Sequence, residues 1–333
     1  MLFTAMTAMA VDGVSNQLVS ITSNDGTVLA GTLTRPANEN GKLPGIVLLQ
    51  GSGPIDRDGN QPPVFRTDVL RQIAEGLALK GLATLRYDKR GLPANVSSVP
   101  ADPAQYPAYF SWDRYVDDAY AAYAFLRAQP GIEMTKTGFL GHSEGGLIAL
   151  DLTSRLVPTE KPAFMILAAT PGRRVDAVLQ EQIGQKLTEQ KASQAQRKFF
   201  LGENERIMKT IRDTGKVPDN VPAGLAALYP AYLGPFLQSW FKLNPPALAT
   251  RYSGPVLLLQ GDADMQVSPE RDALVLDRAL QRREGSDHAL VVVPRGSHNL
   301  KPLQNDKDPG FQGEIDPSVI ERTASWLLSR LDS

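Results

Sequence analysis

The chain has 333 residues, of which 42% are hydrophobic, a length and apolar content that fit one large core or two ordinary domains and exclude a disordered or fibrous protein. Its formal net charge is -1, which excludes a global field that would draw it to nucleic acid or an anionic membrane, so the expected partner is a small, roughly neutral molecule. The chain has no cysteine and three histidines, which excludes disulfides, thiolate nucleophiles and Cys-based zinc sites and argues against a His-rich metal centre.

The first ten residues, MLFTAMTAMA, end in a small-residue pattern that resembles a signal-peptide cleavage site. They lack a basic segment and are short, so we interpret them as an N-terminal leftover or a frayed end. No apolar stretch reaches the ~18–20 residues that a membrane span needs. We therefore expect a cytoplasmic protein without membrane contact, or a periplasmic or secreted one if residues 1–10 are the remnant of a signal peptide.

Apolar runs bounded by turn residues predict eight strands. They cover residues 17–23, 27–34, 45–50, 83–87, 137–140, 163–169, 256–260 and 288–293. The turn at Ser23–Gly26 predicts a hairpin between the first two strands, whereas helical stretches separate the later ones, as a parallel sheet requires. The runs IVLLQ and VLLLQ do not alternate with polar residues, which is typical of strands covered on both faces.

Apolar spacing also predicts the helices that cover this sheet. One helix follows Thr67 as N-cap and ends before Gly81, a second follows Ser111, and the last begins at Asp316 with Pro317 in the first helical position. Their inward faces are Leu70, Ile73, Ala74 and Leu77; Val116, Ala119, Tyr120 and Tyr123; and Ile320, Ala324, Leu327 and Leu331.

About eighty residues, from Pro171 to Arg251, separate two strands without a clear strand of their own. Such a length far exceeds the usual ~2–6 residue connection and predicts an inserted subdomain. Residues 175–190 and 194–210 have helical patterns. Residues 225–241 are rich in aromatic residues, glycine and proline, and their apolar side chains either cover the core or face a ligand.

The sequence GHSEGG at residues 141–146 follows the fifth predicted strand and precedes a helix that includes residues 147–152. Its Gly141, Ser143 and Gly145 fit the GxSxG pattern, in which a sharp turn lifts a nucleophilic serine above the sheet. The turn would also direct the backbone N–H of Glu144 at an oxyanion. The alternative is a glycine-rich turn with an N-capping serine.

A nucleophilic serine needs a base and an acid that orients the base, and both follow along the chain. Asp264 comes after the strand at 256–260, and His298 comes after the strand at 288–293. Because ligands bind at the carboxyl ends of the strands in such sheets, we predict a triad of Ser143, Asp264 and His298. We assign His142 a structural role, His288 a packed or solvated position, and Asp262 a direction away from the site.

The second oxyanion donor should follow the third strand, where the sequence reads Gln50-Gly-Ser-Gly-Pro54. We predict the backbone N–H of Ser52, with that of Gly53 as the alternative. A dinucleotide-binding GxGxxG pattern fails here because Asp56 stands where glycine is needed, and there is no Walker A sequence. The charged runs at 56–58 and 87–91 are predicted to brace the loops around the site.

At these positions the chain resembles the α/β-hydrolase superfamily, and more narrowly its bacterial carboxylesterases. The matching motifs are GSGPIDRDG (51–59), YDKRG (87–91), GHSEGG (141–146) and GDADMQV (261–267). The resemblance implies an α/β-hydrolase fold: an eight-stranded, mostly parallel sheet with helices on both faces, a catalytic core of residues 1–170 and 251–333, and a helical cap at 171–250. The chain departs from the family after Gly91, where a proline-rich stretch that runs to Pro107 should reshape the entrance.

The function that this resemblance implies is hydrolysis of small to medium carboxylic esters through an acyl-enzyme, with no cofactor and no metal. A peptidase, lactonase or thioesterase with the same triad is one alternative. Another is a non-catalytic binding module on a hydrolase scaffold. Dehalogenase and epoxide-hydrolase chemistry are disfavoured because those members have aspartate where this chain has Ser143. The sequence leaves the oligomeric state open.

Overall fold

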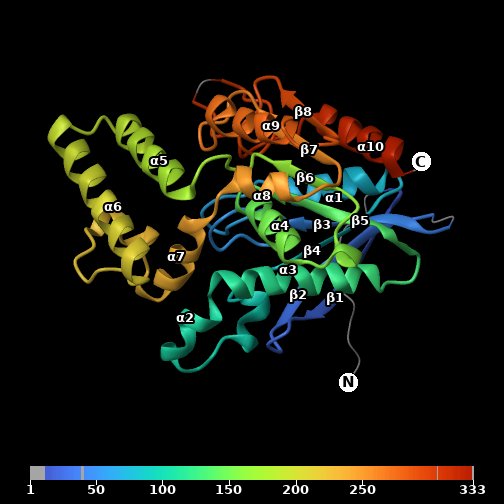
Figure 1. Cartoon of the computed structure of the whole chain (residues 1–333), viewed down its shortest axis with the longest axis horizontal. Helices are drawn as coiled ribbons and strands as arrows, with labels where there is room; N and C mark the ends of the chain where they lie inside the picture. Colours follow the sequence, from blue (N-terminus) through green and yellow to red (C-terminus); the bar gives the residue numbers. More distant parts are fainter. Residues whose placement is uncertain (1–11, 39–40, 306, 332–333) are drawn as a thin grey trace.

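An eight-stranded sheet forms the centre of the chain in a computed structural model that describes residues 12–38, 41–305 and 307–331 (Figure 1). Its strands are β1 (Val14–Thr22), β2 (Val28–Pro36), β3 (Leu43–Leu49), β4 (Ala83–Tyr87), β5 (Ile132–His142), β6 (Met165–Ala168), β7 (Val256–Gly261) and β8 (His288–Val293). Each of the eight predicted strands is confirmed. The segment interpreted as an N-terminal leftover, residues 1–10, lies outside the described residues.

The strands are ordered β1-β2-β4-β3-β5-β6-β7-β8 across the sheet. The β1–β2 hairpin and the β2–β4 pair are antiparallel, and every other neighbouring pair is parallel. The sheet is therefore mostly parallel, as predicted. The loops that leave β3, β4, β5, β6, β7 and β8 consequently meet at one edge, which is where an open α/β sheet binds its ligands.

The central strand β3 shows why its apolar run has no polar alternation. Val47 and Leu49 belong to one core cluster, whereas Ile46 and Leu48 belong to a second cluster on the opposite face. Strand side chains alternate between the two faces of a sheet, so an uninterrupted apolar run means that both faces are covered.

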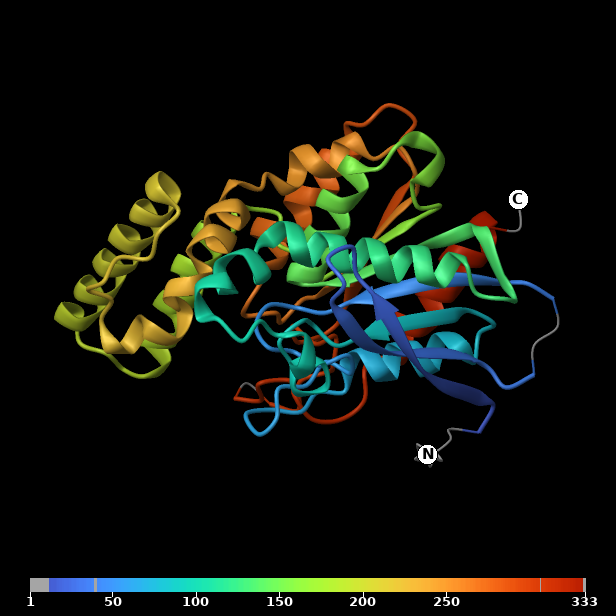
Figure 2. The same cartoon turned by 90° about the horizontal axis from the view of Figure 1, so that it is seen from below.

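Helices supply this cover on both faces (Figures 1 and 2). One face carries α3 (Trp112–Arg127), α4 (Glu144–Arg155), α8 (Pro245–Arg251) and α9 (Leu274–Gln281), and the other carries α1 (Val69–Ala78) and α10 (Pro317–Leu331). No helix in the described ranges has both the length and the apolarity to cross a membrane.

The predicted helix starts are confirmed at α3 and α10 but not at α1. Ser111 is the N-cap of α3, and the carboxylate of Asp316 accepts a 2.8 Å hydrogen bond from the backbone N–H of Ser318 at the start of α10. The prediction that Thr67 caps α1 is wrong. The helix begins one residue later, with Asp68 as N-cap, while the Thr67 hydroxyl donates a 2.6 Å hydrogen bond to the carbonyl of Gly59.

Four α-helices lie between β6 and β7: α5 (Val175–Glu189), α6 (Gln194–Thr214), α7 (Gly234–Lys242) and α8. Both ribbon views show α5, α6 and α7 projecting from one end of the sheet (Figures 1 and 2), whereas α8 packs against α4 and α9. The predicted helices at 175–190 and 194–210 correspond to α5 and α6. Pairs α5–α6, α6–α7 and α5–α7 contact one another, so the projecting helices form one packed group.

A test of the packing between β5 and β6 uses Gly138. A Cβ placed on this residue would lie 2.3 Å from the carbonyl oxygen of Phe164, and a backbone atom cannot turn aside as a side chain can. We expect Gly138→Ala to lower the free energy of unfolding by about 1–3 kcal/mol through overpacking, as measured by urea denaturation. Gly202→Ala in α6 is the matched control, because a Cβ there meets nothing within 4 Å. It should raise stability by about 0.5–1 kcal/mol. Equal effects of the two substitutions would contradict the tight approach at Gly138.

Candidate active site

The predicted serine lies at a sharp turn between β5 and α4. Ser143 has a φ of 55° and a ψ of -119°, a left-handed conformation that a residue with a side chain rarely adopts. Its backbone N–H donates a 2.8 Å hydrogen bond to the carbonyl of Ala168 at the end of β6. The turn therefore has the geometry that the GxSxG pattern predicts.

The glycines that flank this serine are required by close packing. A Cβ on Gly145 would lie 2.2 Å from the carbonyl oxygen of Leu49, and a Cβ on Gly141 would lie 2.4 Å from the carbonyl of Gly145. The start of α4 can therefore press directly against the end of β3 only because these two positions carry no side chain. This contact brings Ser143 next to the loop that follows β3.

Asp264 and His298 form a buried hydrogen-bonded pair. Oδ2 of Asp264 is 2.8 Å from Nδ1 of His298, and these two residues are 5% and 8% exposed. Oδ1 of Asp264 accepts hydrogen bonds from the backbone N–H groups of Gln266 and Val267, at 2.8 and 2.9 Å. The carboxylate is thus held in one orientation, and it holds the imidazole.

The charge of Asp264 is favoured by these same contacts. Burial by itself raises its pKa, but the nearby His298 and the backbone donors outweigh burial and hold the pKa below the ordinary value for aspartate. The alternative acid, Asp262, is exposed to solvent, and its backbone N–H donates to the carbonyl of Val293. The structure therefore pairs His298 with Asp264, as the sequence analysis expects.

His142 supports the backbone of the loop that carries His298. Its Nε2 is 2.8 Å from the carbonyl oxygen of His298, and the centres of the two rings are 4.8 Å apart. Burial, together with the nearby His298, lowers the pKa of His142 to about 4, so this imidazole is neutral near pH 7 and donates its Nε2 proton to the carbonyl. The position fits the structural role predicted for His142.

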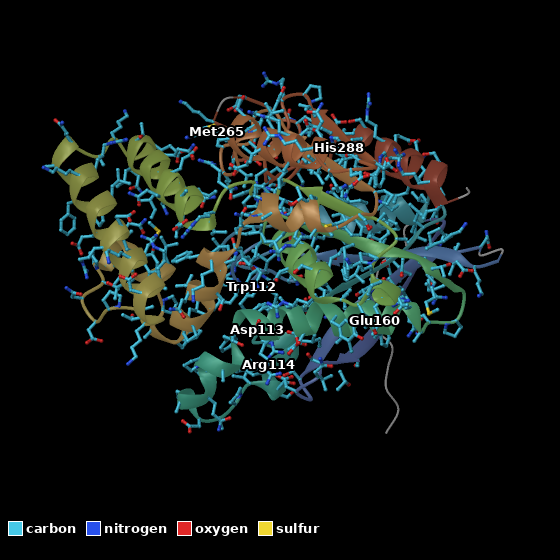
Figure 3. The ribbon with its side chains drawn as sticks, viewed as in Figure 1. Trp112, Asp113, Arg114, Glu160, Met265 and His288 are labelled. Carbon is cyan, nitrogen blue, oxygen red and sulfur yellow. The ribbon has the colours of Figure 1, made fainter. Side chains whose placement is uncertain are left out.

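The third histidine lies apart from this site. His288 begins β8, where Nδ1 is 2.7 Å from the hydroxyl oxygen of Ser286 and Nε2 is 3.3 Å from the carboxylate of Asp277. Figure 3 shows Met265, the neighbour of Asp264, on the side of the sheet nearer to α5, and His288 farther toward the opposite end. His288 was predicted to be packed or solvated, and its half-buried position with these contacts fits the packed alternative.

Ser143 and His298 line one cavity of about 220 Å³, together with His142 and Ser52. The loop after β3 forms part of its wall, because a Cβ placed on Gly51 would lie 3.3 Å from the Cβ of Ser143. The fold thus brings the predicted nucleophile, base and oxyanion loop to the same space. The other predicted oxyanion residue, Glu144, opens α4, and the first N–H groups of a helix have no partner within the helix.

A buried lysine joins three of the loops around this space. The ammonium group of Lys89, in the loop after β4, is 2.6 Å from the carbonyl oxygen of Gly51, 3.3 Å from that of Gly53 and 2.7 Å from Oε1 of Glu144. The side chains of Lys89 and Glu144 are 5% and 3% exposed. From the sequence, residues 87–91 were predicted only to brace the loops, and Glu144 only to supply a backbone N–H. The motif YDKRG after a strand was the available signal.

The charged run at residues 56–58 braces the same region. Arg57 forms an ion pair with Asp88 at 2.6 Å, and Asp58 forms one with Arg86 at 2.8 Å. Both pairs link the loop after β3 to β4 or to the residues that follow it. The predicted bracing role fits these contacts.

Asp272 anchors the start of the projecting helices. Its fully buried carboxylate accepts hydrogen bonds from the backbone N–H groups of Gly172, Arg173 and Ser268, each at 3.0 Å, and pairs with the Arg173 guanidinium at 2.7 Å. The segment that leads from β6 into α5 is therefore held against the loop that carries Asp264. Sequence analysis did not single out Asp272.

A larger cavity of about 600 Å³, which Ser143 also lines, lies between the sheet edge and the projecting helices. Its wall includes residues of α5 and α7, Leu92 from the proline-rich stretch that follows Gly91, and Phe110 just beyond that stretch. The stretch contacts the segment before α7, because the rings of Tyr106 and Tyr232 lie 5.9 Å apart. Among the described residues, no group of three or more His, Cys, Asp and Glu side chains is arranged to hold a metal ion.

The buried Lys89–Glu144 pair generates a stability prediction. Glu144→Gln leaves an ammonium group buried without an opposite charge, so we expect the free energy of unfolding to fall by about 3–5 kcal/mol. The double variant Lys89→Met, Glu144→Leu removes both charges and should recover much of that loss. Asp213→Asn, which breaks the exposed pair of Lys209 and Asp213, is the control and should change stability by less than about 1 kcal/mol. A double variant no more stable than Glu144→Gln would show that the charges are not the cause.

His142 generates a pH prediction. Its folded pKa of about 4 lies below the ordinary value of 6.5, so the unfolded chain binds a proton that the folded chain resists. Stability is therefore fully present above pH 6.5 and falls as the pH drops toward 4, by about 3 kcal/mol for this group. We expect urea denaturation of His142→Gln to show a smaller decline than the unmodified protein between pH 6.5 and 4. Parallel curves for the two proteins would contradict a buried, neutral His142.

Comparisons with known proteins agree with this fold. The esterase EstD of Thermotoga maritima is 26% identical over 305 residues, which cover 90% of this chain and 65% of EstD. Est1E from Butyrivibrio proteoclasticus superposes with a TM-score of 0.59 at 16% identity, over 95% of this chain and 99% of that chain. An esterase of Pyrococcus furiosus gives 0.55 at 17% identity, over 95% and 91%. A family model described as serine aminopeptidase, S33, matches residues 67–302. Since that match covers well over half of the sequence, the chain belongs to the serine aminopeptidase S33 family, and its fold is that of the α/β-hydrolases.

Proposed function

We propose that this chain is a serine carboxylesterase that hydrolyses a small to medium, neutral ester through an acyl-enzyme. The observation that carries the proposal is the convergence of Ser143, on its strained turn, with the buried Asp264–His298 pair at one cavity. An alcohol, an imidazole and a carboxylate in this order are the parts of a hydrolytic triad.

In the first half of the reaction, Ser143 attacks the ester carbonyl while His298 takes the proton of the serine hydroxyl. The carbonyl oxygen becomes an oxyanion, which accepts hydrogen bonds from the backbone N–H groups of Ser52 and Glu144. His298 then gives its proton to the oxygen of the leaving alcohol, and the acyl group stays on Ser143.

In the second half, His298 takes a proton from water as the water attacks the acyl-enzyme, and returns it to the oxygen of Ser143 as the acid leaves. Asp264 keeps Nδ1 of the imidazole hydrogen-bonded in both halves. Its lowered pKa keeps the carboxylate ionised near neutral pH, so it stabilises the positively charged imidazole that each proton transfer creates.

Lys89 contributes by positioning the oxyanion loop. A trans peptide bond directs its C=O and the following N–H in opposite directions. Because the carbonyl of Gly51 points at Lys89, the N–H of Ser52 points away from the lysine. The same ammonium holds the side chain of Glu144, the residue that supplies the second N–H. One buried charge thereby orients both halves of the oxyanion hole.

The projecting helices α5, α6 and α7 act as the cap of this enzyme in our proposal. Residues of α5 and α7 form the roof of the larger cavity, and Asp272 fixes the point where the chain enters α5. A roof of this kind excludes water from the reacting ester, which strengthens the electrostatic stabilisation of the oxyanion. The esterase name of the relative EstD supports the assignment of this site to ester bonds.

An aminopeptidase is the second candidate, because the matching family model has that description. An aminopeptidase must bind the positively charged N-terminus of a peptide, and a carboxylate in the cavity usually does so. Among the described residues that line the two cavities, Glu144 is the one with a carboxylate side chain. Its negative charge is already neutralised by the ammonium group of Lys89. This arrangement favours a neutral ester over a cationic peptide.

Replacement of the proposed nucleophile tests the function. We expect Ser143→Ala to lower kcat on an activated aryl ester by ~10⁴-fold or more, because the acyl-enzyme can no longer form. Ser154→Ala, on the helix that follows Ser143, is the matched control and should retain the normal rate, because this hydroxyl donates to the carbonyl of Asp151. Hydrolysis by Ser143→Ala at the rate of the unmodified enzyme would refute the proposed mechanism.

Two further measurements separate the candidates. A serine-directed phosphonate should add to Ser143, and an unlabelled protein would favour a binding module over an enzyme. The unmodified enzyme should hydrolyse ethyl esters faster than aminoacyl arylamides, whereas the reverse order would favour the aminopeptidase.

A further inference from the structure

Ser143 lies at the junction of two cavities of unequal size. The larger has a volume of about 600 Å³ and the smaller about 220 Å³, and Ser52, Gln61, Ser143 and Gln182 line both. An ester attacked by Ser143 has two parts, the acyl group and the alcohol, which extend in different directions from the reacting carbon. The question is which part enters which cavity.

The position of His298 answers this question. In the proposed reaction His298 donates a proton to the oxygen of the leaving alcohol, so the alcohol must lie on the side of the imidazole. His298, His142 and Asn299 line the smaller cavity. Gly53 and Glu144 line the larger cavity. The alcohol therefore enters the smaller space and the acyl group enters the larger one.

The wall of the larger cavity indicates the chemistry of the acyl group. Five aromatic side chains contribute to it: Phe110, Tyr115, Tyr232, Phe236 and Trp240. They contact one another edge to face or at a tilt, with 5.2 Å between the ring centres of Phe110 and Tyr232 and 5.4 Å between those of Tyr115 and Phe236. Such a wall favours contact with a flat apolar or aromatic group.

The charged residues in this wall do not select a charged acyl group, because each of them is already paired. Lys89 binds Glu144, and the guanidinium of Arg90 binds the carboxylate of Asp118 through Nε at 2.8 Å and a terminal nitrogen at 2.6 Å. Burying a further charge beside these pairs would cost desolvation energy without a new partner. The cavity thus suits a neutral acyl chain.

A pair of phenylalanines forms part of the wall of the smaller cavity. The rings of Phe65 and Phe311 lie 5.1 Å apart, and both residues line this space. Asn299, which also lines it, is held by a 3.1 Å hydrogen bond from its side chain to the carbonyl of Gly310. The space available to the alcohol is therefore limited by packed side chains.

We propose that this enzyme prefers esters that join a bulky, neutral, aromatic acyl group to a short alcohol. The inference rests on the proposed function, since it takes Ser143 as the nucleophile and His298 as the proton donor. It goes further in assigning each cavity to one part of the substrate.

Two isomeric esters test this orientation. Ethyl 3-phenylpropanoate has the aromatic group on the acyl side, and 3-phenylpropyl acetate has the same group on the alcohol side. The two esters have the same molecular formula, and in each the leaving group is an unactivated primary alcohol. We expect kcat/KM to be at least about tenfold higher for ethyl 3-phenylpropanoate. Equal values, or a preference for the acetate, would overturn the inference while ester hydrolysis itself stands.

If neither isomer is hydrolysed, labelling of Ser143 by the serine-directed phosphonate shows which of the two proposals has failed. If neither ester is hydrolysed but Ser143 is labelled, the aromatic acyl assignment is wrong. If neither is hydrolysed and Ser143 is not labelled, the proposed function has failed as well.

Variants of the two cavities give the second test. Leu179→Trp, in the α5 wall of the larger cavity, should lower kcat/KM for ethyl 3-phenylpropanoate by at least about tenfold relative to ethyl acetate. Phe311→Ala, which opens the smaller cavity, should raise kcat/KM for 3-phenylpropyl acetate relative to ethyl acetate. Leu18→Trp is the control, because Leu18 is 70% exposed on β1, and it should change neither ratio. The inference would be overturned if Leu179→Trp lowered kcat/KM for 3-phenylpropyl acetate instead, and Phe311→Ala raised it for ethyl 3-phenylpropanoate instead.

Discussion

The buried ammonium group of Lys89 is the constraint on which the site depends. It joins the loop after β3, the loop after β4 and the start of α4, through two carbonyl oxygens and the carboxylate of Glu144. A charge buried this deeply is stable only when it is paired and hydrogen-bonded. The three loops must therefore keep their relative positions for the chain to bury Lys89, and the same positions orient the N–H groups proposed to bind the oxyanion.

The two histidines near Ser143 differ because their surroundings differ. His142 is buried without a carboxylate partner, so its pKa falls to about 4 and it remains a neutral donor to the backbone of His298. His298 has the carboxylate of Asp264 at Nδ1 and a cavity at its other side. An ionised neighbour stabilises an imidazolium, whereas an apolar enclosure opposes it. His142 is thus suited to support the backbone, and the surroundings of His298 agree with the proton transfer proposed for it.

Selectivity is separated from chemistry in this fold. The proposed triad and oxyanion loop lie in the loops that follow the strands and at the start of α4, where the sheet positions them. The larger cavity is formed by α5, by α7 and by the stretch around Phe110, which are added outside the sheet. Changes in these added segments can alter the size and polarity of the cavity without moving the reacting groups, which explains how one scaffold serves many substrates.

Local patterns predict the eight strands, most of the helices and the candidates Ser143, Asp264 and His298, because apolar periodicity, turn residues and the GxSxG pattern each involve residues close together in the chain. The three-dimensional packing determines that Lys89 reaches Glu144, that Asp272 holds the start of α5, and that Asp68 rather than Thr67 occupies the N-cap position of α1. It also determines that Ser143 lies between two unequal cavities. The contact of Gly172 with Asp272 joins residues a hundred positions apart, and the smaller cavity joins residues still farther apart in the sequence. Contacts of that kind depend on how the strands are ordered and packed, which no local pattern encodes.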